Sequence, residues 1–156
     1  MDIFSHALYA NLVFSKLPIE QRALATILSV APDLCSFSLV SASFFFKRLV
    51  NKKKFSLDEI PKYVDDLYNI THSLVIWLGI FLVLILFNLK WLAVVYLGWA
   101  LHIIIDIFTH TDEFFPTPIF WPISRLHFSG IKWASKWFIV GNYSFIIILY
   151  LLYFFK

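Results

Sequence analysis

Residues 91–108 read WLAVVYLGWALHIIIDIF, an apolar run that carries one histidine and one aspartate. Its length approaches the roughly 20 residues with which a helix crosses about 30 Å of hydrocarbon. His102 and Asp106 are four positions apart, so they lie on one face of such a helix. An unpaired imidazole or carboxylate is costly in hydrocarbon. The run therefore predicts a membrane-spanning helix whose polar residues have partners elsewhere in the chain.

The whole chain shares this apolar character. Of its 156 residues, 60% are hydrophobic and 20% are aromatic, well above the roughly 45–50% apolar share of soluble domains. Further apolar runs cover residues 73–89 and 137–155, while the run at residues 3–14 is too short to span. We expect an all-α fold, a multi-pass transmembrane helical bundle of about four spans plus a short N-terminal helix. It forms a single domain over residues 1–156.

The fourth expected span, residues 23–46, is interrupted by Pro32 and Asp33. Proline disfavours helical conformation in the residue before it and cannot donate to the previous helical turn. The segment is therefore either one kinked span or two shorter helices that meet at this point. Either arrangement makes Asp33 a buried position with a special role.

The charge distribution favours a lipid environment over nucleic acid. The net charge is only +3, and the basic residues are not interleaved with aromatics in a polar groove. Asp2 near the start and the lack of a basic region argue against a cleaved signal peptide. Under the positive-inside rule the loops 47–62 and 109–136 are cytoplasmic. They hold nine basic residues, Lys47, Arg48, Lys52, Lys53, Lys54, Lys62, Arg125, Lys132 and Lys136, against four on the other face, Lys16, Arg22, Lys90 and Lys156.

A depth argument tests whether the buried polar residues can meet. In a helical hairpin that turns near Leu89, His72 and Asp106 are equally far from the turn, about 25 Å along the helices. His102 lies one turn from Asp106. A second turn near residues 19–20 would place His6 level with Asp33. Imidazole and carboxylate at one depth suit a divalent metal, zinc above all, with one or two ions.

Simpler readings remain open for several of these residues. The pair His102 and Asp106 alone is more often an ion pair or a hydrogen-bonded core pair than a metal site. His127 is expected at the surface or the membrane interface. Hydroxyls near the histidines could orient metal ligands or could serve as helix caps and back-bonding groups; they are Thr71, Ser73 and Thr109.

Five short motifs, taken in order, resemble a family of membrane-bound proteins regarded as metal-dependent hydrolases of the inner membrane. Singly the motifs are weak, but their order and spacing are specific. They are MDIFSH (1–6), APDLC (31–35), THS (71–73), HIIIDIFTH (102–110) and FPTPIFWPIS (115–124). The resemblance implies a multi-pass protein with a metal site formed by His6, Asp33, His72, His102 and Asp106. Two positions depart from the family pattern: Cys35 replaces a second acid, and Leu67-Tyr68 replaces His-Arg.

The resulting hypothesis is a membrane-bound, metal-dependent hydrolase with its site toward the cytoplasm. Its substrate would be a phosphoester or another ester of a lipid or membrane-associated molecule. Asp33, Asp106 or His110 would take a proton. Arg125 would hold a phosphate unless it only snorkels to the interface. Alternatives are a metal-binding membrane protein without catalytic activity, a small transporter, or a scaffold whose polar pairs fix helix register. The aromatic stretch 114–122 would be a lipid-entry rim or an interfacial belt.

Overall fold

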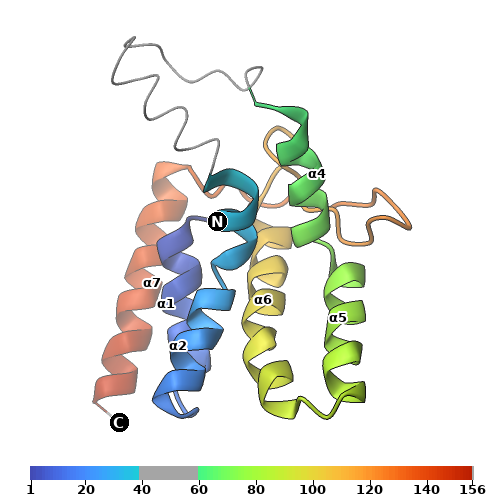
Figure 1. Ribbon diagram of the computed structural model, residues 1–156. Coiled ribbons are helices and arrows are strands. Elements are labelled where there is room, and N and C mark those ends of the chain that lie inside the picture. The colour runs from blue at the N-terminus through green and yellow to red at the C-terminus, as the bar shows by residue number, and fades with distance from the viewer. Residues whose placement is uncertain (39–59, 156) are drawn as a thin grey trace, which may run out of the picture.

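The computed structural model describes residues 1–38 and 60–155, whose elements are all helices (Figure 1). The predicted all-α class is therefore confirmed. Residues 31–38 form a further helical segment that precedes the undescribed part. The bounded helices are α1 (Ile3–Val13), α2 (Ile19–Leu28), α4 (Lys62–Thr71), α5 (Leu74–Leu86), α6 (Lys90–Thr109) and α7 (Lys136–Phe154).

The predicted hairpin between the first two apolar runs is present as α5 and α6. Asn88 adopts a left-handed backbone conformation with φ of 59°, which asparagine tolerates better than most residues. Ser73 caps α5 by accepting hydrogen bonds from the amides of Val75 and Ile76, at 3.1 and 3.3 Å. Helix α4 precedes α5, and the chain is bent by 50° at the break between these two helices.

Helix α6 is the centre of the bundle. Of the residues in its apolar stretch, 50% are buried inside the protein, whereas only 6% are buried in the apolar stretch of α7. Figure 1 shows α6 between α5 on one side and α2 on the other. Gly98 allows the close approach of α2, because a Cβ atom at this position would lie 2.2 Å from the carbonyl oxygen of Ala25. A small apolar core of Ala10, Phe14, Ala25 and Val95 joins α1, α2 and α6.

Helix α7 packs on the outside of α1 (Figure 1), and polar side chains join the two helices. The Asn142 amide donates to Ser5 Oγ at 2.7 Å and accepts from Tyr9 Oη at 2.8 Å. Tyr143 Oη donates to Asp2, the N-cap of α1, at 2.8 Å. The rest of the α7 surface is largely exposed and apolar, which fits a helix that also faces lipid.

The structure selects between the two arrangements considered for the Pro32 break. Helix α2 ends at Leu28, residues 29–30 form a turn, and a new helical segment starts at residue 31. Pro32 thus sits in a first helical turn, where its missing N–H has no cost. The remainder of the predicted span, residues 39–46, lies outside the described residues.

The predicted turn near residues 19–20 is wrong. The chain turns at residues 14–18, because Pro18 precedes the first turn of α2 and ends the connection. Consequently Ser29, and not Asp33, lies opposite His6, with Ser29 Oγ 3.3 Å from the His6 carbonyl oxygen. Asp33 reaches the same region from the next helical segment.

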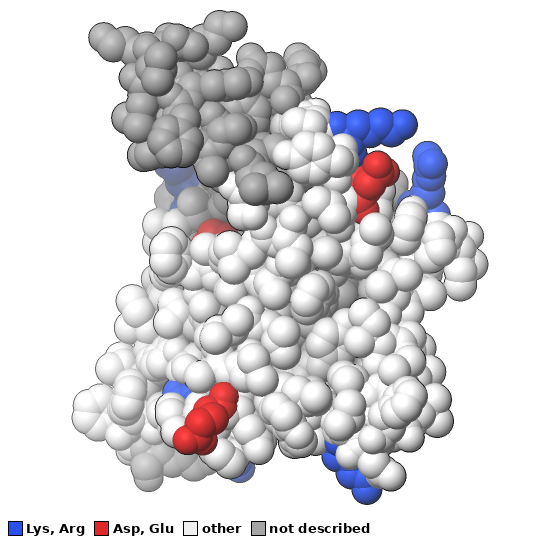
Figure 2. All heavy atoms as spheres, viewed as in Figure 1, with Lys and Arg blue, Asp and Glu red and all other residues white. Residues whose placement is uncertain are grey.

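By length and composition, α6 and α7 are long and apolar enough to cross a membrane, and the bent pair of α4 and α5 adds a third candidate. The expected count of about four spans also included residues 23–46, and residues 39–46 of that segment lie outside the described residues. On the face drawn in Figure 2, charged side chains lie toward the two ends and the middle band is almost uncharged. This distribution fits a helical membrane protein.

Candidate metal centre

Four polar side chains from three parts of the chain meet at one end of the bundle. Asp33 comes from the segment after α2, His72 from the break between α4 and α5, and His102 and Asp106 from one face of α6. One ligand atom from each lies within 4.8 Å of the others. His72, His102 and Asp106 are fully buried, while the Asp33 side chain is 17% exposed. Among these four residues, Asp33 is therefore the one whose side chain reaches the protein surface.

The Nε2 atoms of the two histidines form the centre of this cluster. They lie 3.0 Å apart. Asp106 Oδ2 is 3.2 Å from the Nε2 of His102 and 3.6 Å from that of His72. Asp33 Oδ1 lies 3.7 and 3.6 Å from the same two atoms. Ligand atoms bound tetrahedrally to one ion at about 2.0–2.2 Å are separated by roughly 3.3–3.6 Å, and the distances to the two Nε2 atoms, 3.0 to 3.7 Å, are close to that spacing.

Hydrogen bonds to backbone carbonyls fix the tautomer of both rings. His102 Nδ1 lies 2.7 Å from the carbonyl oxygen of Ser29, and His72 Nδ1 lies 3.1 Å from that of Tyr68. A carbonyl oxygen only accepts, so each Nδ1 carries a proton, and in the neutral form of each ring Nε2 then presents a lone pair. Two such lone pairs at 3.0 Å cannot form a hydrogen bond with each other. They can share a cation, and the Nδ1–H···O=C arrangement is typical of metal-ligating histidines.

Asp106 supplies a second sign that the site fits a cation. Its Oδ2 atom is buried and has no hydrogen-bond partner within the described residues, a costly state for a carboxylate. Both ring nitrogens of His6 likewise lack a hydrogen-bond partner there. His6 Nε2 approaches Asp106 Oδ1 at 3.0 Å, and its ring stacks on that of His102 with 3.8 Å between centroids. A divalent metal therefore fits the chemistry of the donor set.

His110 lies at the edge of the cluster, directly after α6. Its Nε2 is 3.4 Å from Asp106 Oδ2 and 3.1 Å from the amino group of Met1, which also contacts Asp106. Its Nδ1 donates to the carbonyl oxygen of Phe115 at 2.8 Å. Burial lowers the pKa of His110, so the ring is neutral near pH 7 and its Nε2 accepts.

Tyr68 contacts the cluster, although the sequence marked it only as a departure from a family pattern. Its ring stacks on His72 with 3.8 Å between centroids. Its hydroxyl donates to the carbonyl oxygen of Phe115 at 2.8 Å and lies 3.3 Å from Thr117 Oγ1. The position one helical turn before His72 was the available signal, because i and i+4 side chains share a helix face.

The three predicted hydroxyl residues have mixed local roles. Thr71 Oγ1 lies 2.9 Å from His72 Nδ1 and donates to the carbonyl oxygen of Leu67. Thr109 Oγ1 donates to the carbonyl oxygen of Ile105 at 3.1 Å and is 3.4 Å from Asp106. Ser73 caps α5. Thr71 and Thr109 thus contact members of the cluster, whereas Ser73 acts in helix capping.

Three residues singled out in the sequence lie outside the cluster. Arg125 and His127 are exposed on the loop between α6 and α7, and His127 pairs with Asp112 at 3.2 Å. Cys35 is a free, exposed cysteine. The departure at Cys35 therefore removes no group from the described cluster.

The N-cap of α1 supports the position of His6. Ser5 donates its backbone N–H and its hydroxyl to the Asp2 carboxylate at 3.0 and 2.7 Å. Burial is the largest influence on the Asp2 pKa and raises it, but the bonds from Ser5 and Tyr143 outweigh it, so the pKa lies below its usual value. An ionised Asp2 at a helix N-terminus also stabilises α1.

A comparison with protein families identifies the membership of this chain. The model described as YdjM inner membrane protein matches residues 1–156. The chain belongs to the YdjM inner membrane protein family. No curated protein and no solved structure matches significantly. Membership of the YdjM family, together with the apolar helices, supports a location in the inner membrane.

Proposed function

We propose that this protein is a metal-dependent hydrolase that acts on a phosphoester of a lipid or other membrane-associated substrate. One observation carries the proposal. The buried Nε2 lone pairs of His72 and His102 face each other at 3.0 Å beside Asp106 Oδ2, which has no hydrogen-bond partner within the described residues. Such a concentration of buried acceptors is stabilised by a bound cation and is otherwise unfavourable.

His72, His102, Asp106 and Asp33 would hold the ion, and zinc suits this set of nitrogen and oxygen ligands. A divalent metal supplies Lewis acidity, which polarises a phosphoryl oxygen and lowers the pKa of water. Carbonyl oxygens of Ser29 and Tyr68 orient the two imidazoles through Nδ1.

The proton of the attacking water needs an acceptor near the cluster. Asp33 is the partly exposed carboxylate of the group, and His110 Nε2 carries a lone pair at its edge. In the hydrolysis a bond forms between the water oxygen and phosphorus, the ester P–O bond breaks, and the water proton passes to Asp33 or His110. The leaving alkoxide takes a proton in turn.

Metal content is the first test of this proposal. Detergent-purified protein, expressed in zinc-supplemented medium, should contain metal near one equivalent by elemental analysis. His102→Ala and Asp106→Ala should lose most of it, whereas the matched exposed variant Asp112→Asn should retain it. Metal at unchanged stoichiometry in both cluster variants would rule out the site.

Hydrolysis is tested separately with phosphoester and phospholipid substrates. Activity should disappear with a chelator, return with added metal, and fall at least about a hundredfold in Asp33→Asn if Asp33 is the proton acceptor. Metal binding without turnover on any substrate would favour the metal-binding or transporter alternatives. Retention of activity after complete metal removal would contradict the proposal.

A further inference from the structure

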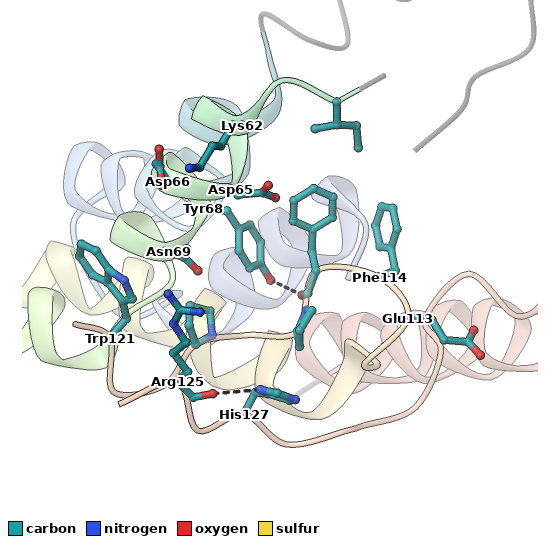
Figure 3. A pocket seen from close by; sticks show the side chains of 14 residues that line it. Lys62, Asp65, Asp66, Tyr68, Asn69, Glu113, Phe114, Trp121, Arg125 and His127 are labelled. Atoms are coloured by element: carbon teal, nitrogen blue, oxygen red, sulfur yellow. Dashed lines mark hydrogen bonds between the residues drawn. The ribbon is translucent and has the colours of Figure 1, made fainter. Parts of the chain in front are cut away.

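A cavity of about 630 Å³ opens beside the metal cluster, between the start of α4 and the loop that follows α6 (Figure 3). Its size falls within the range of small-molecule sites, roughly 300–1,000 Å³. Tyr68 belongs to both sites, because it lines the cavity and stacks on His72. A ligand in this cavity is thus separated from the candidate metal ligands by one side chain.

The cavity carries charges of both signs. Lys62, Asp65 and Asp66 come from the first turns of α4, and Glu113 and Arg125 come from the loop after α6. Figure 3 shows the α4 residues on one side of Tyr68 and Arg125 on the other. A site for a simple anion would be weakened by the three carboxylates that line the cavity, since like charges repel. The arrangement instead suits a ligand with a negative and a positive group.

The surroundings of the cavity favour a lipid over a soluble ligand. The residues that flank Arg125 on the loop are large, apolar and exposed: Ile123 by 79%, Leu126 by 57% and Phe128 by 53%. Trp121 lines the cavity itself, and tryptophan is enriched at membrane interfaces. The cavity also lies at the end of the apolar helix α6. Acyl chains could contact these apolar side chains while the headgroup occupies the charged cavity.

We propose that this cavity binds the headgroup of a zwitterionic phospholipid, with the phosphate at Arg125 and the ammonium group at Asp65 and Asp66. Arginine matches a phosphate with two parallel hydrogen bonds, and the carboxylates and aromatic rings both attract an ammonium. This inference deepens the proposed function, and it rests on that function only for the statement that the bound lipid is the substrate. Headgroup binding is independent of metal.

The test measures binding by calorimetry to the full chain in detergent, with chelator present. The probes are dihexanoyl phosphatidylethanolamine, dihexanoyl phosphatidylglycerol and free phosphoethanolamine. The zwitterionic lipid should bind at least about tenfold more tightly than either other probe. If phosphatidylglycerol bound as tightly as phosphatidylethanolamine, the carboxylates would not bind the ammonium group as proposed. If free phosphoethanolamine bound as tightly, the ligand would not be a lipid.

Variants locate the two halves of the headgroup. Arg125→Gln should weaken phosphatidylethanolamine binding by about tenfold or more. The double variant Asp65→Asn with Asp66→Asn should abolish the preference over phosphatidylglycerol. Lys90→Gln and Glu20→Gln, exposed and distant from the cavity, are matched controls and should bind as the wild type does. Unchanged binding in Arg125→Gln would overturn the proposal.

The outcomes for the lipid site and for hydrolysis are separable. His102→Ala should lose metal but keep lipid binding, and the chelator in the calorimetry gives the same comparison on the unaltered chain. Lipid binding without hydrolysis would leave the cavity assignment intact and remove the proposed function. Metal-dependent hydrolysis of other esters without selective lipid binding would support a metal-dependent hydrolase and remove the cavity assignment.

Discussion

Tyr68 is held both by its ring and by its hydroxyl. The ring packs on His72, and the hydroxyl donates to the carbonyl oxygen of Phe115. That carbonyl also accepts from His110 Nδ1. The residue therefore links α4 to the loop after α6, and it supports two histidines of the site at once. Its two kinds of contact can be removed separately.

Two substitutions at Tyr68 should have graded effects. Tyr68→Phe keeps the stacked ring and leaves the Phe115 carbonyl bonded to His110, so we expect a loss of about 0.5–1.5 kcal/mol in the free energy of unfolding. Tyr68→Ala also opens a cavity and should cost about 3–5 kcal/mol. Denaturant unfolding in detergent micelles measures both. Tyr63→Phe, at an exposed position on the same helix, is the control. Equal losses of stability in Tyr68→Phe and Tyr68→Ala would show that the Tyr68 ring does not contribute.

At the scale of the helices, α6 is fixed by a close contact with α2. A Cβ atom at Gly98 would overlap backbone atoms of Ala25, which cannot move as a flexible side chain would. The same contact brings the end of α2 near α6, where the Ser29 carbonyl accepts from His102. The spacing of these two helices is therefore coupled to the orientation of the His102 ring, a candidate metal ligand.

Gly98→Ala should destabilise the protein by about 1–3 kcal/mol and lower its metal content, because α2 must shift away from α6. Gly141→Ala in α7 is the matched control. Nothing lies within 4 Å of a Cβ atom there, so alanine should be neutral or stabilising by up to about 1 kcal/mol. Thermal unfolding and elemental analysis measure the two effects. Equal melting temperatures for the two variants would contradict the close packing of α2 on α6.

Helix α7 is held to α1 by polar contacts in an otherwise apolar pair. Asn142→Leu removes the bonds to Ser5 and Tyr9, and interhelical hydrogen bonds in membrane proteins average about 0.6 kcal/mol each. We expect a loss of about 1 kcal/mol and faster hydrogen exchange in α1. Ser144→Ala removes an exposed hydroxyl from the same helix and should change neither quantity. Unaltered exchange in α1 would show that α7 does not hold it.

At the scale of the molecule, periodicity and depth predicted a large part of the arrangement. The apolar runs gave α6 and α7 to within a residue or two, and equal distances from the turn at Leu89 predicted the approach of His72 to Asp106. The approach of Asp33 to the cluster was predicted from a wrong turn position. Asp33 reaches the cluster because the helix breaks after Leu28.

Other features depend on contacts that no local pattern encodes. The stacking of Tyr68 on His72 requires the bend between α4 and α5, and the bonds from Asn142 require α7 to return beside α1. Carbonyl partners of the imidazoles, such as Ser29, are backbone atoms whose positions follow from packing. A hydropathy pattern predicts which helices are apolar, but it does not predict which neighbours they contact.

The charge distribution predicts how the bundle is oriented in the membrane, and this orientation can be tested with the single cysteine removed. Asn88 lies in the turn before α6, and Ser129 lies beyond its other end, where its hydroxyl accepts from the amide of Asp112 at 3.3 Å. From the positive-inside rule we predict that the end with more basic residues is cytoplasmic. In a Cys35→Ser background, Ser129→Cys should react with a membrane-impermeant maleimide only after permeabilisation of the inner membrane, and Asn88→Cys should react in intact spheroplasts. Both variants should react fully in detergent, and labelling of Ser129→Cys in intact spheroplasts would reverse the orientation and place the metal site on the outer side.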